Sequence, residues 1–463
     1  MKYKVWGKAK AVLIPHKRHH VTLGVVIFSI ALIVAITLAV RLGMLYSGVF
    51  YTGEREPYLQ SVGMDSVVIR WQSKERVRGR VELYGGNAEA LFTKQESHSR
   101  EDHEISVNKL KPATRYFYRL YHNESLYKEG SDYWFETAPV TASDTPIRLW
   151  LLGDPGRSGK SILSVKNAMQ TWLNKNPRDG YSDLNLIIST GDSAYDHGTN
   201  EEYQKNLFSV HDDVFKNYAF WPVYGNRDAK GWSFFNLFNL PTNAELGGVA
   251  SGTERYYSVD YGQLHLIFLD SNEGGYTAND KMIKWMKKDL ETTTQKWLIV
   301  FMHHPPYTRG KHNSNDPKDS GNRMFNMRNR VIPVLEDAGV DMIVSGHSHS
   351  YERSFLIDCH YGLTSDFKES SKLQAGPEFR KPVGRVPHSG TVYMVLGSSA
   401  EAVNGKLDHP AMAVSEAILG SMIIDVESTS LVARFINNKA EVVDKFVIKK
   451  MSVNDSYKTE CAG

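Results

Sequence analysis

Asp192 and Tyr195 are the residues of this chain whose types and spacing point most directly to chemistry. They lie in the stretch 191–195, of sequence Gly-Asp-Ser-Ala-Tyr, which follows the apolar run Leu184–Ile188. Because such a run is typical of a buried strand, both side chains should lie in the loop at its carboxyl end, where open α/β sheets bind ligands. A carboxylate can bridge two cations, and a phenolate three residues later can reach one of them. The stretch therefore suggests a two-metal centre, although a turn and a packing tyrosine would explain it in isolation.

Four further motifs follow apolar runs in the same way, and each contains a ligand for a hard or borderline metal ion. They are Gly153-Asp154-Pro155-Gly156, Gly225-Asn226-Arg227-Asp228, Met302-His303-His304-Pro305-Pro306-Tyr307 and Gly346-His347-Ser348-His349. Their glycines would permit tight turns that bring the backbone close to the metals. Each motif alone can be explained by a purely structural role, as a turn or a buried histidine. Five such motifs in one region predict a single metal site.

The region from residue 146 to 449 alternates apolar runs with helical patterns, which predicts a layered α/β domain. The expected strands are Leu149–Leu152, Leu184–Ile188, Leu264–Leu269, Trp297–Phe301, Met342–Val344 and Val392–Leu396, and the expected helices lie near Ser161–Asn174, Ala278–Leu290 and Arg323–Ala338. The polar, turn-rich stretch Asp358–Gly390 predicts a long surface loop. Three closing strands are expected between Met422 and Ile448.

Residues 57–138 have a different rhythm of short alternating runs separated by turn residues, which predicts an all-β sandwich. Trp71 would lie in the core of an early strand, and Tyr116 would mark the corner at the start of a later strand. This part resembles a fibronectin type III module. It offers no catalytic chemistry of its own.

The 463 residues include 55 basic and 52 acidic side chains, for a formal net charge of +3. A balance so close to neutral produces no broad positive field, so we expect no nucleic-acid partner. The basic excess is concentrated in residues 1–20, directly before the uncharged stretch Val21–Val40. As a helix, that stretch would be about 30 Å long, which is enough to span a bilayer.

We therefore expect residues 1–20 to be a cytoplasmic basic segment and residues 21–40 to be a single transmembrane anchor. The remainder would then lie across the membrane, in a bacterial periplasm or another extracytoplasmic space, or in the lumen of a eukaryotic compartment. A cleaved signal peptide is the alternative, although its apolar region is usually shorter and no small-residue cleavage site follows Arg41.

Cys359 and Cys461 are the two cysteines of the chain, which excludes a disulfide scaffold and a thiolate metal cluster. In an oxidising compartment they could pair and tie down the C-terminal tail. Two unpaired thiols are the alternative.

The five motifs, in their order along the chain, resemble those of calcineurin-like metallophosphoesterases. Tyr195 and the stretch 346–353, of sequence Gly-His-Ser-His-Ser-Tyr-Glu-Arg, resemble a purple acid phosphatase. A β-sandwich ahead of the catalytic domain is the arrangement of the plant-type members. The resemblance extends from about residue 57 to about residue 449, and it implies a four-layer α/β sandwich for the catalytic domain.

The resemblance also implies a dinuclear metal centre with a defined ligand set. One ion, normally Fe(III), would be bound by Asp154, Tyr195 and His349. The other, Fe(II), Zn(II) or Mn(II), would be bound by Asn226, His303 and His347, with Asp192 bridging the two. We assign His303 rather than His304 because the first histidine of the pair matches the family pattern. A hydroxide held by the two ions would attack the phosphorus atom of a phosphate ester in line.

The chain departs from the family at Arg227, where a histidine that contacts the phosphate is usual. Arginine can hold a phosphate oxygen with two hydrogen bonds but cannot release a proton near neutral pH. General acid catalysis would then fall to His312, nine residues after His303, which matches a second family histidine near the substrate. A surface position for His312 is the alternative.

We expect a membrane-anchored acid phosphatase that hydrolyses phosphate monoesters. A phosphodiesterase or nucleotide pyrophosphatase with the same metal centre is the first alternative, and Arg227 could be the residue that changes the substrate. An envelope adhesion or scaffold protein with a vestigial metal site is the second, although the presence of all seven ligands argues against it.

Overall fold

The computed structural model describes residues 18–46, 48–85, 89–273, 280–452 and 461. Residues up to Ser47 and residues from Gly48 onwards form two separate units. The first contains helix α1 (Arg18–Tyr46). Its stretch Gly24–Gly43 is long and apolar enough to cross a membrane, by length and composition. The expected span 21–40 lies within α1, whereas the basic residues before Arg18 lie outside the described residues.

The second unit begins with two antiparallel sheets, as expected for an all-β sandwich. One has the strand order β1-β2-β5, and the other has the order β4-β3-β6-β7 with β8 paired to β6. The strands are β1 (Arg55–Gln60), β2 (Ser66–Val77), β3 (Gly79–Tyr84), β4 (Ala90–Gln95), β5 (Arg100–Asn108), β6 (Arg115–His122), β7 (Ser125–Lys128) and β8 (Trp134–Glu136). Trp71 is fully buried in the core. The Tyr116 hydroxyl accepts a hydrogen bond from the Lys111 N–H at 2.9 Å, which fixes the expected corner.

The sandwich is packed against the α/β region that follows it. The Tyr58 hydroxyl donates to Leu237 O at 2.9 Å, and the Tyr118 hydroxyl donates to Lys216 O at 2.8 Å. Arg70 Nη1 donates to Asn239 Oδ1 at 3.1 Å. One hydrophobic core runs through both parts, so the sandwich is a fixed support for the α/β region.

The α/β region contains two sheets that face each other. A seven-stranded sheet has the order β11-β10-β9-β21-β22-β23-β18, and an eight-stranded sheet has the order β12-β13-β14-β15-β19-β16-β17 with β20 paired to β16. Their strands are β9 (Ile147–Leu152), β10 (Leu186–Ser189), β11 (Phe220–Pro222), β12 (Tyr257–Tyr261), β13 (Leu264–Leu269), β14 (Trp297–Met302), β15 (Met342–Ser345), β16 (Tyr351–Ile357), β17 (Lys372–Gln374), β18 (Glu378–Pro382), β19 (Thr391–Leu396), β20 (Met412–Glu416), β21 (Gly420–Val426), β22 (Ser430–Asn437) and β23 (Val442–Met451).

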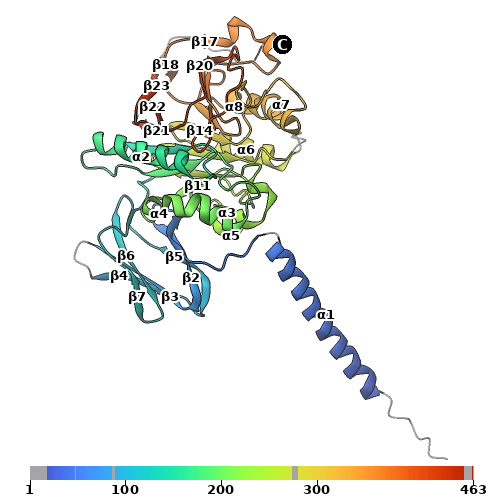
Figure 1. The fold of residues 1–463 in the computed structure, drawn as a ribbon. Coiled ribbons are helices and arrows are strands. Elements are labelled where there is room, and N and C mark those ends of the chain that lie inside the picture. The colour runs from blue at the N-terminus through green and yellow to red at the C-terminus, as the bar shows by residue number, and fades with distance from the viewer. Residues whose placement is uncertain (1–17, 47, 86–88, 274–279, 453–460, 462–463) are drawn as a thin grey trace, which may run out of the picture. The chain divides into compact units, whose positions relative to one another are not determined.

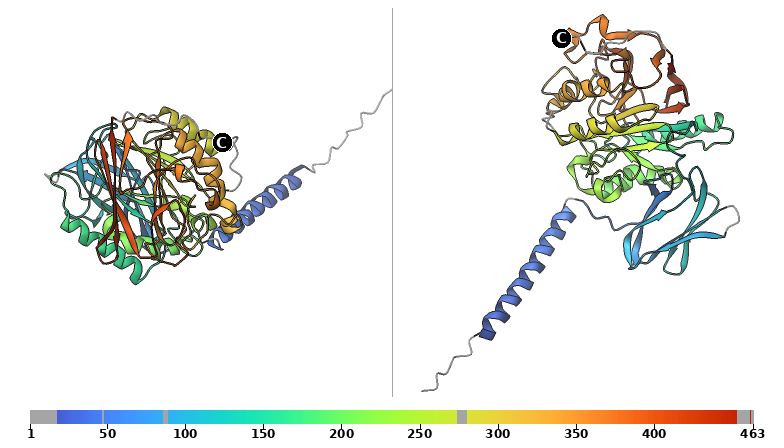
Figure 2. Two further views of the ribbon diagram at one scale, coloured as in Figure 1. Left: turned by 90° about the horizontal axis from the view of Figure 1, so that it is seen from above. Right: turned by 180° about the vertical axis from the view of Figure 1, so that it is seen from behind.

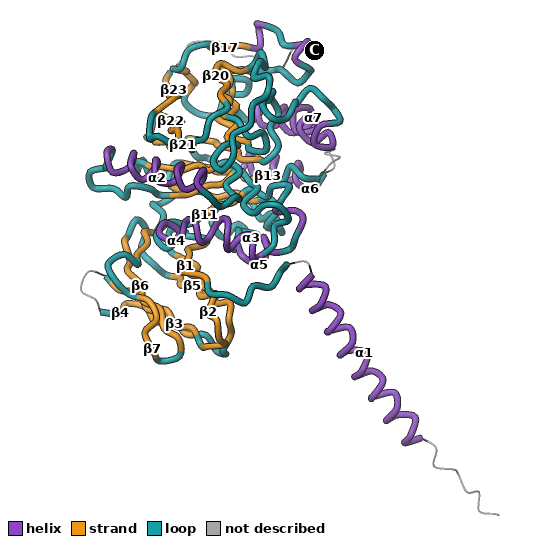
Figure 3. The backbone as a smooth tube through the Cα atoms, in the orientation of Figure 1, coloured by secondary structure: helices purple, strands orange, loops and turns teal. Residues whose placement is uncertain are grey.

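Helices cover the outer faces of both sheets, which gives the expected four layers (Figures 1 and 2). The seven-stranded sheet carries α2 (Lys160–Lys175), α3 (Asn200–Tyr203), the π-helical turn η1 (Gln204–Phe208), α4 (Ser209–Phe215) and, further along the chain, the short turn η2 (Asp228–Lys230) and α5 (Ser233–Leu237). The eight-stranded sheet carries α6 (Lys281–Thr292), η3 (Asp319–Asn322), α7 (Arg323–Asn326), η4 (Met327–Val331) and α8 (Ile332–Asp337). Figure 3 shows the strands of both sheets between these helices.

Alternation along β13 separates the two faces of its sheet. Phe268 belongs to the core between the sheets, whereas Ile267 and Leu269 pack with the helices outside. Buried on both faces, such strands appear in the sequence as continuous apolar runs. This is why the apolar runs located them correctly.

The stretch Asp358–Gly390 is not the surface loop that its polarity predicts. It contains β17, β18 and the short 3-10 turns η5 (Thr364–Asp366) and η6 (Glu369–Ser371), and β18 pairs in parallel with β23. The Lys381 ammonium is buried, lies 3.1 Å from the Asp341 carboxylate and donates to Val340 O at 2.9 Å. A paired charge can occupy a core position, so polarity alone misidentifies this segment.

Cys359 and Cys461 form a disulfide, which decides between the two alternatives for the cysteines. The bond joins residues 102 positions apart and holds Cys461 to the α/β region.

Candidate metal centre

The five predicted motifs meet at one edge of the two facing sheets. β9, β10 and β11 run parallel to one another, as do β13, β14, β15 and β19. Asp154, Asp192 and Asn226 follow the first three strands, and His303 and His347 follow β14 and β15. Parallel strands bring their carboxyl ends to the same edge, so residues far apart in the sequence become neighbours.

Unusual backbone conformations hold several of these residues. Asp154, Asp192 and His347 have φ values of 50°, 52° and 66°, in the left-handed region that residues with a side chain rarely adopt. Such conformations persist only when the surroundings impose them, and they concentrate at functional sites. Gly225 packs so closely on Asp192 that a side chain there would collide with the Asp192 backbone nitrogen. The glycine is required here for close approach.

Asp154, Tyr195 and His349 form one group. The Tyr195 hydroxyl lies 3.1 Å from Asp154 Oδ1 and 3.1 Å from His349 Nε2, and His349 Nε2 lies 3.7 Å from Asp154 Oδ1. All three side chains are buried. The His347 N–H donates to both oxygens of Asp154, at 3.1 and 2.9 Å, and so fixes the orientation of the carboxylate.

Asn226, His303 and His347 form a second group. His303 Nε2 lies 3.0 Å from Asn226 Oδ1, and the ring centroids of His303 and His347 are 5.0 Å apart. His303 Nδ1 donates to Thr190 O at 2.9 Å, which leaves Nε2 as the nitrogen with a free lone pair. His304 instead makes its hydrogen bond through Nδ1 to the Ser271 hydroxyl, at 2.8 Å. This geometry favours His303 over His304 as a ligand.

Asp192 lies between the two groups. Its Oδ1 is 3.4 Å from His303 Nε2, and one ligand atom from each of Asp154, Asp192 and His303 lies within 4.8 Å of the others. The Arg227 N–H donates to Asp192 Oδ1 at 2.7 Å. The structure thus brings together all seven predicted ligands, with the proposed bridging carboxylate in the middle.

The donor set fits two bound cations. Burial and the charge of Asp192 raise the pKa of Asp154 well above its usual range, and burial together with both carboxylates does the same for Tyr195. Burial lowers the pKa of His303 and His347, and it lowers that of His349 to about 3, so all three imidazoles are neutral. Burial and mutual repulsion thus oppose the ionisation of these oxygens, and a bound cation would supply the positive charge that their anionic forms need, beside imidazoles that are already neutral.

A cavity of about 290 Å³ opens above these side chains. Besides ligand residues, its lining includes the basic side chains of Arg227, Lys311, His312 and Arg323. The ring of His312 stacks on that of His347, with centroids 4.0 Å apart. His312 is therefore part of the site and not an isolated surface residue.

Asp319 orients His312. It accepts a hydrogen bond from His312 Nδ1 at 2.8 Å, which leaves Nε2 available to the cavity. Burial alone would raise the pKa of Asp319, but hydrogen bonds from the Asn313 N–H and the Ser320 hydroxyl hold it below its usual value. The carboxylate is thus ionised and holds the imidazole ring through Nδ1.

Sequence reasoning missed several residues that position the ligands. Glu401 lies 2.9 Å from His349 Nδ1, the Ser320 hydroxyl lies 2.6 Å from His347 Nε2, and Arg157 lies over the Tyr195 ring at 4.3 Å. Glu401 follows β19, so the same carboxyl-end rule could have found it. Ser320 and Arg157 come from loops whose patterns gave no signal.

Comparisons with known proteins agree with this geometry. Residues 147–351 match the family model for calcineurin-like phosphoesterases. Purple acid phosphatase 1 of Ipomoea batatas is 27% identical over 347 residues, which cover 70% of this chain and 65% of that protein. Purple acid phosphatase 21 of Arabidopsis thaliana is 23% identical over 259 residues, covering 54% and 53% of the two chains. The chain thus spans between about half and two thirds of the length of these relatives.

The fold is shared with solved structures. The purple acid phosphatase PPD1 from yellow lupin (Lupinus luteus) seeds superposes with a TM-score of 0.67 at 15% identity, covering 89% of this chain and 78% of that one. The structure of PhoD superposes with a TM-score of 0.59 at 13% identity, covering 87% and 91%. Residues 147–351 thus form a calcineurin-like phosphoesterase domain, and the proposed ligands lie within it. The relatives named above, to which the chain is similar, are purple acid phosphatases.

Proposed function

We propose that this chain is a metal-dependent phosphoric ester hydrolase that acts on phosphate monoesters. The observation that carries the proposal is the convergence of seven metal-ligand side chains beneath a cavity lined by basic residues. The trivalent ion would be Fe(III), bound by Asp154, Tyr195 and His349. Fe(II), Zn(II) or Mn(II) would be bound by Asn226, His303 and His347, with Asp192 shared by both ions.

The two ions, when bound, would lower the pKa of a water molecule and stabilise the charge of the phosphoryl group. The basic side chains of the cavity attract the anionic ester. The Arg227 side chain extends from the loop that carries Asn226, and its guanidinium lies over the Tyr195 ring at 5.3 Å. From there it would bind a phosphate oxygen through two parallel N–H groups.

His312 would protonate the oxygen of the leaving alcohol. Its Nδ1 is held by Asp319, so the proton would be transferred from Nε2, on the cavity side. The Asp319 carboxylate would stabilise the imidazolium before transfer and keep the ring in place. Arg227 cannot perform this step because a guanidinium does not release its proton near neutral pH.

The experiment is a comparison of one aryl phosphate monoester with one aryl diester, using the detergent-solubilised full-length protein loaded with iron and zinc or manganese. We expect turnover of the monoester to exceed that of the diester, and we expect Asp192→Asn to abolish both. Preference for the diester would instead establish the phosphodiesterase or nucleotide pyrophosphatase alternative. A metal-loaded protein that hydrolyses neither compound would refute the proposal and favour an adhesion or scaffold role.

We also propose that the chain is anchored by α1, with residues 1–20 cytoplasmic and the metal centre extracytoplasmic. The support is the 20-residue stretch Gly24–Gly43 preceded by a basic segment. Residues 57–138 and 146–449 would be two domains joined by a packed boundary. N-terminal sequencing of the mature protein from washed membranes tests the anchor, because a signal peptide would be missing from it.

A further inference from the structure

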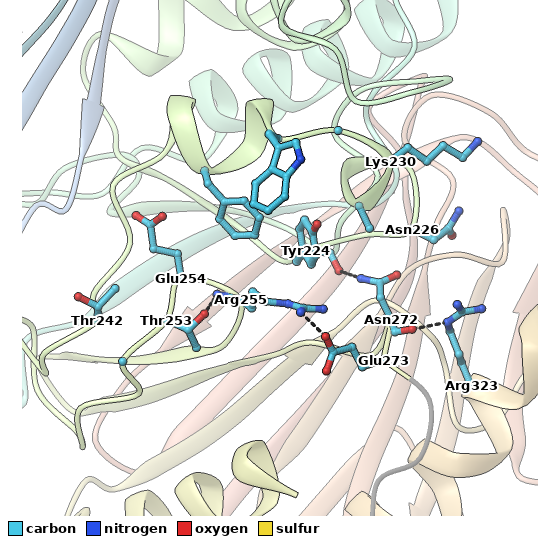
Figure 4. Close-up of a pocket in the computed structure, with 15 residues that line it drawn as sticks. Tyr224, Asn226, Lys230, Thr242, Thr253, Glu254, Arg255, Asn272, Glu273 and Arg323 are labelled. Carbon is cyan, nitrogen blue, oxygen red and sulfur yellow. Dashed lines mark hydrogen bonds and ion pairs between the residues drawn. The ribbon is translucent and has the colours of Figure 1, made fainter. Parts of the chain in front are cut away.

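A second, larger cavity adjoins the metal site and has no role in the chemistry described above. Its volume is about 900 Å³, and it shares Asn226 and Arg323 with the cavity over the metal ligands. Figure 4 shows Asn226 and Arg323 at one end, with Thr242 and Glu254 at the other. The cavity therefore extends away from the place where a phosphate would bind.

One loop contributes to both cavities. It begins after β11 with the proposed ligand Asn226 and continues through η2 to Trp232 and α5. Trp232 lines the large cavity and is 69% exposed, although an indole usually finds a buried position. Its ring lies 6.3 Å from that of Phe235, which in turn lies 5.2 Å from that of Tyr224. These three rings give the cavity an apolar aromatic wall.

The far wall is polar and fixed. The Gly252 N–H donates to Thr242 O at 2.8 Å, and the Leu240 N–H donates to Glu254 Oε1 at 3.2 Å. Among the described residues, no donor is bonded to the second oxygen of Glu254. Glu254 can thus accept a further hydrogen bond at this end of the cavity.

Part of the remaining charge in the cavity is internally paired, and the Lys230 ammonium donates to Asp196 O at 3.0 Å. Arg255 lies 2.6 Å from Asp270 Oδ2 and also forms an ion pair with Glu273. Arg323 uses Nε and Nη1 for the backbone oxygens of Asn272 and Ser320, and in the described part of the chain it has no carboxylate partner. The one unpaired guanidinium is thus at the end nearest the metal site, where an anionic group would enter.

We propose that the large cavity binds the alcohol part of the ester, and that the preferred class is an ester of an alcohol that carries an aromatic heterocycle with hydrogen-bond donors, such as a nucleoside 5′-monophosphate. The ring would stack on the Trp232–Phe235 wall, and its donors would face Glu254. Stacking on an aromatic side chain suits a planar heterocycle, and a hydrogen-bonding group at the far end discriminates against simple alcohols. This inference rests on the proposed binding of phosphate at the metal site.

The test compares adenosine 5′-monophosphate with glycerol 3-phosphate, using the metal-loaded full-length protein. The kcat/KM ratio of the two esters measures selectivity, and calorimetric titration with each ester measures binding. Trp232→Ala should lower the ratio about tenfold, because it removes the aromatic side chain on which the base would stack. Trp232→Phe should restore most of it. Tyr181→Ala, at an exposed tyrosine that does not line either cavity, is the matched control and should leave the ratio unchanged.

A ratio unchanged by Trp232→Ala, or a loss equal for both esters, would overturn the inference while leaving the hydrolase proposal intact. If neither ester is hydrolysed but binding of adenosine 5′-monophosphate still depends on Trp232, the hydrolase proposal fails and the cavity assignment stands. Binding of adenosine 5′-monophosphate that is no stronger than that of glycerol 3-phosphate would also overturn it.

Discussion

Replacement of Asp192 by asparagine should leave the stability of the metal-free protein unchanged or slightly higher, whereas it should weaken metal binding and abolish turnover. The substitution retains an oxygen that can accept the hydrogen bond from the Arg227 N–H, 2.7 Å away in the native site. It removes one of three buried carboxylates in this region, the others being Asp154 and Asp228. Burial and the charge of Asp192 raise the pKa of Asp154 well above its usual range, so the two carboxylates destabilise each other when no cation is bound.

The difference in the free energy of unfolding between the variant and the native protein should have opposite signs without metal and with metal. One pKa unit of charge interaction corresponds to about 1.4 kcal/mol, so without metal the variant should be as stable as the native protein or more stable by about 1 kcal/mol. With free metal at about 1,000 times its dissociation constant, the native protein should gain about 4 kcal/mol. The variant should gain far less, because it lacks the carboxylate shared by both ions, and it should lose turnover.

The assay is thermal unfolding of the full-length protein in chelator and in excess metal, together with the metal content of each sample. Asp228→Asn is the matched control, since Asp228 is a buried carboxylate in the neighbouring loop that accepts from Gly225 N–H at 2.9 Å and Ser193 N–H at 3.1 Å. Loss of such bonds should destabilise that variant with or without metal, by about 1–3 kcal/mol. If Asp192→Asn follows the pattern of this control and still binds two ions, the reasoning is refuted.

Three further predictions address the surroundings of the site and the core. Glu401→Gln should weaken metal binding by about 10–100-fold in chelator competition, because His349 loses its charged partner; unchanged affinity would contradict this role. His312→Gln should slow hydrolysis of an alkyl phosphate by about 10²–10⁴-fold and barely affect 4-nitrophenyl phosphate, whereas equal losses would make it a binding residue. Although burial lowers it, hydrogen bonds to Asp260 and Asp289 raise the pKa of His265 to about 9. The pKa of His265 is about 6.5 in the unfolded chain and higher in the folded protein. Protonation of His265 therefore contributes up to about 3 kcal/mol to the free energy of unfolding below about pH 6.5, and this contribution is lost as the pH rises through about 9. The melting temperature should therefore fall more steeply between pH 7 and 10 in the native protein than in His265→Gln.

The convergence of the proposed metal ligands could be predicted from the sequence because most of them follow a strand buried on both faces. Continuous apolar runs such as Trp297–Phe301 identify these strands. Parallel pairing within each sheet, together with the facing of the two sheets, then brings Asp154 and His347 together although 193 residues separate them. The choice of His303 over His304 came from the family pattern, and the hydrogen bond from His303 Nδ1 to Thr190 O gives it a physical reason. Chemistry and periodicity agree at these positions, so the sequence predicts which side chains meet, and their role as metal ligands stays a prediction.

The remaining parts depend on contacts that no local pattern encodes. Ser320 reaches His347 from a loop with three residues at positive φ, and that path follows from tertiary packing. Lys381 lies in β18 and is buried because it pairs with Asp341. A prediction based on polarity therefore assigns this strand to a surface loop. Trp232 appears in the sequence as one aromatic among many, and its exposure beside a large cavity becomes evident only in three dimensions.

The departure at Arg227 changes the reacting surface without disturbing the metal ligands, and the backbone explains why. Asp228 anchors the loop through the Gly225 and Ser193 N–H groups and the Tyr203 hydroxyl, the last at 2.5 Å. The Arg227 N–H is occupied by Asp192, so position 227 supports the metal site through its main chain. Its side chain is left to face the cavity and is 31% exposed. The side chain contacts the site through a long ion pair with Asp192, at 3.9 Å, and over the Tyr195 ring, so its replacement should cost little stability. Substrate preference can therefore change at this position while the proposed metal ligands stay the same.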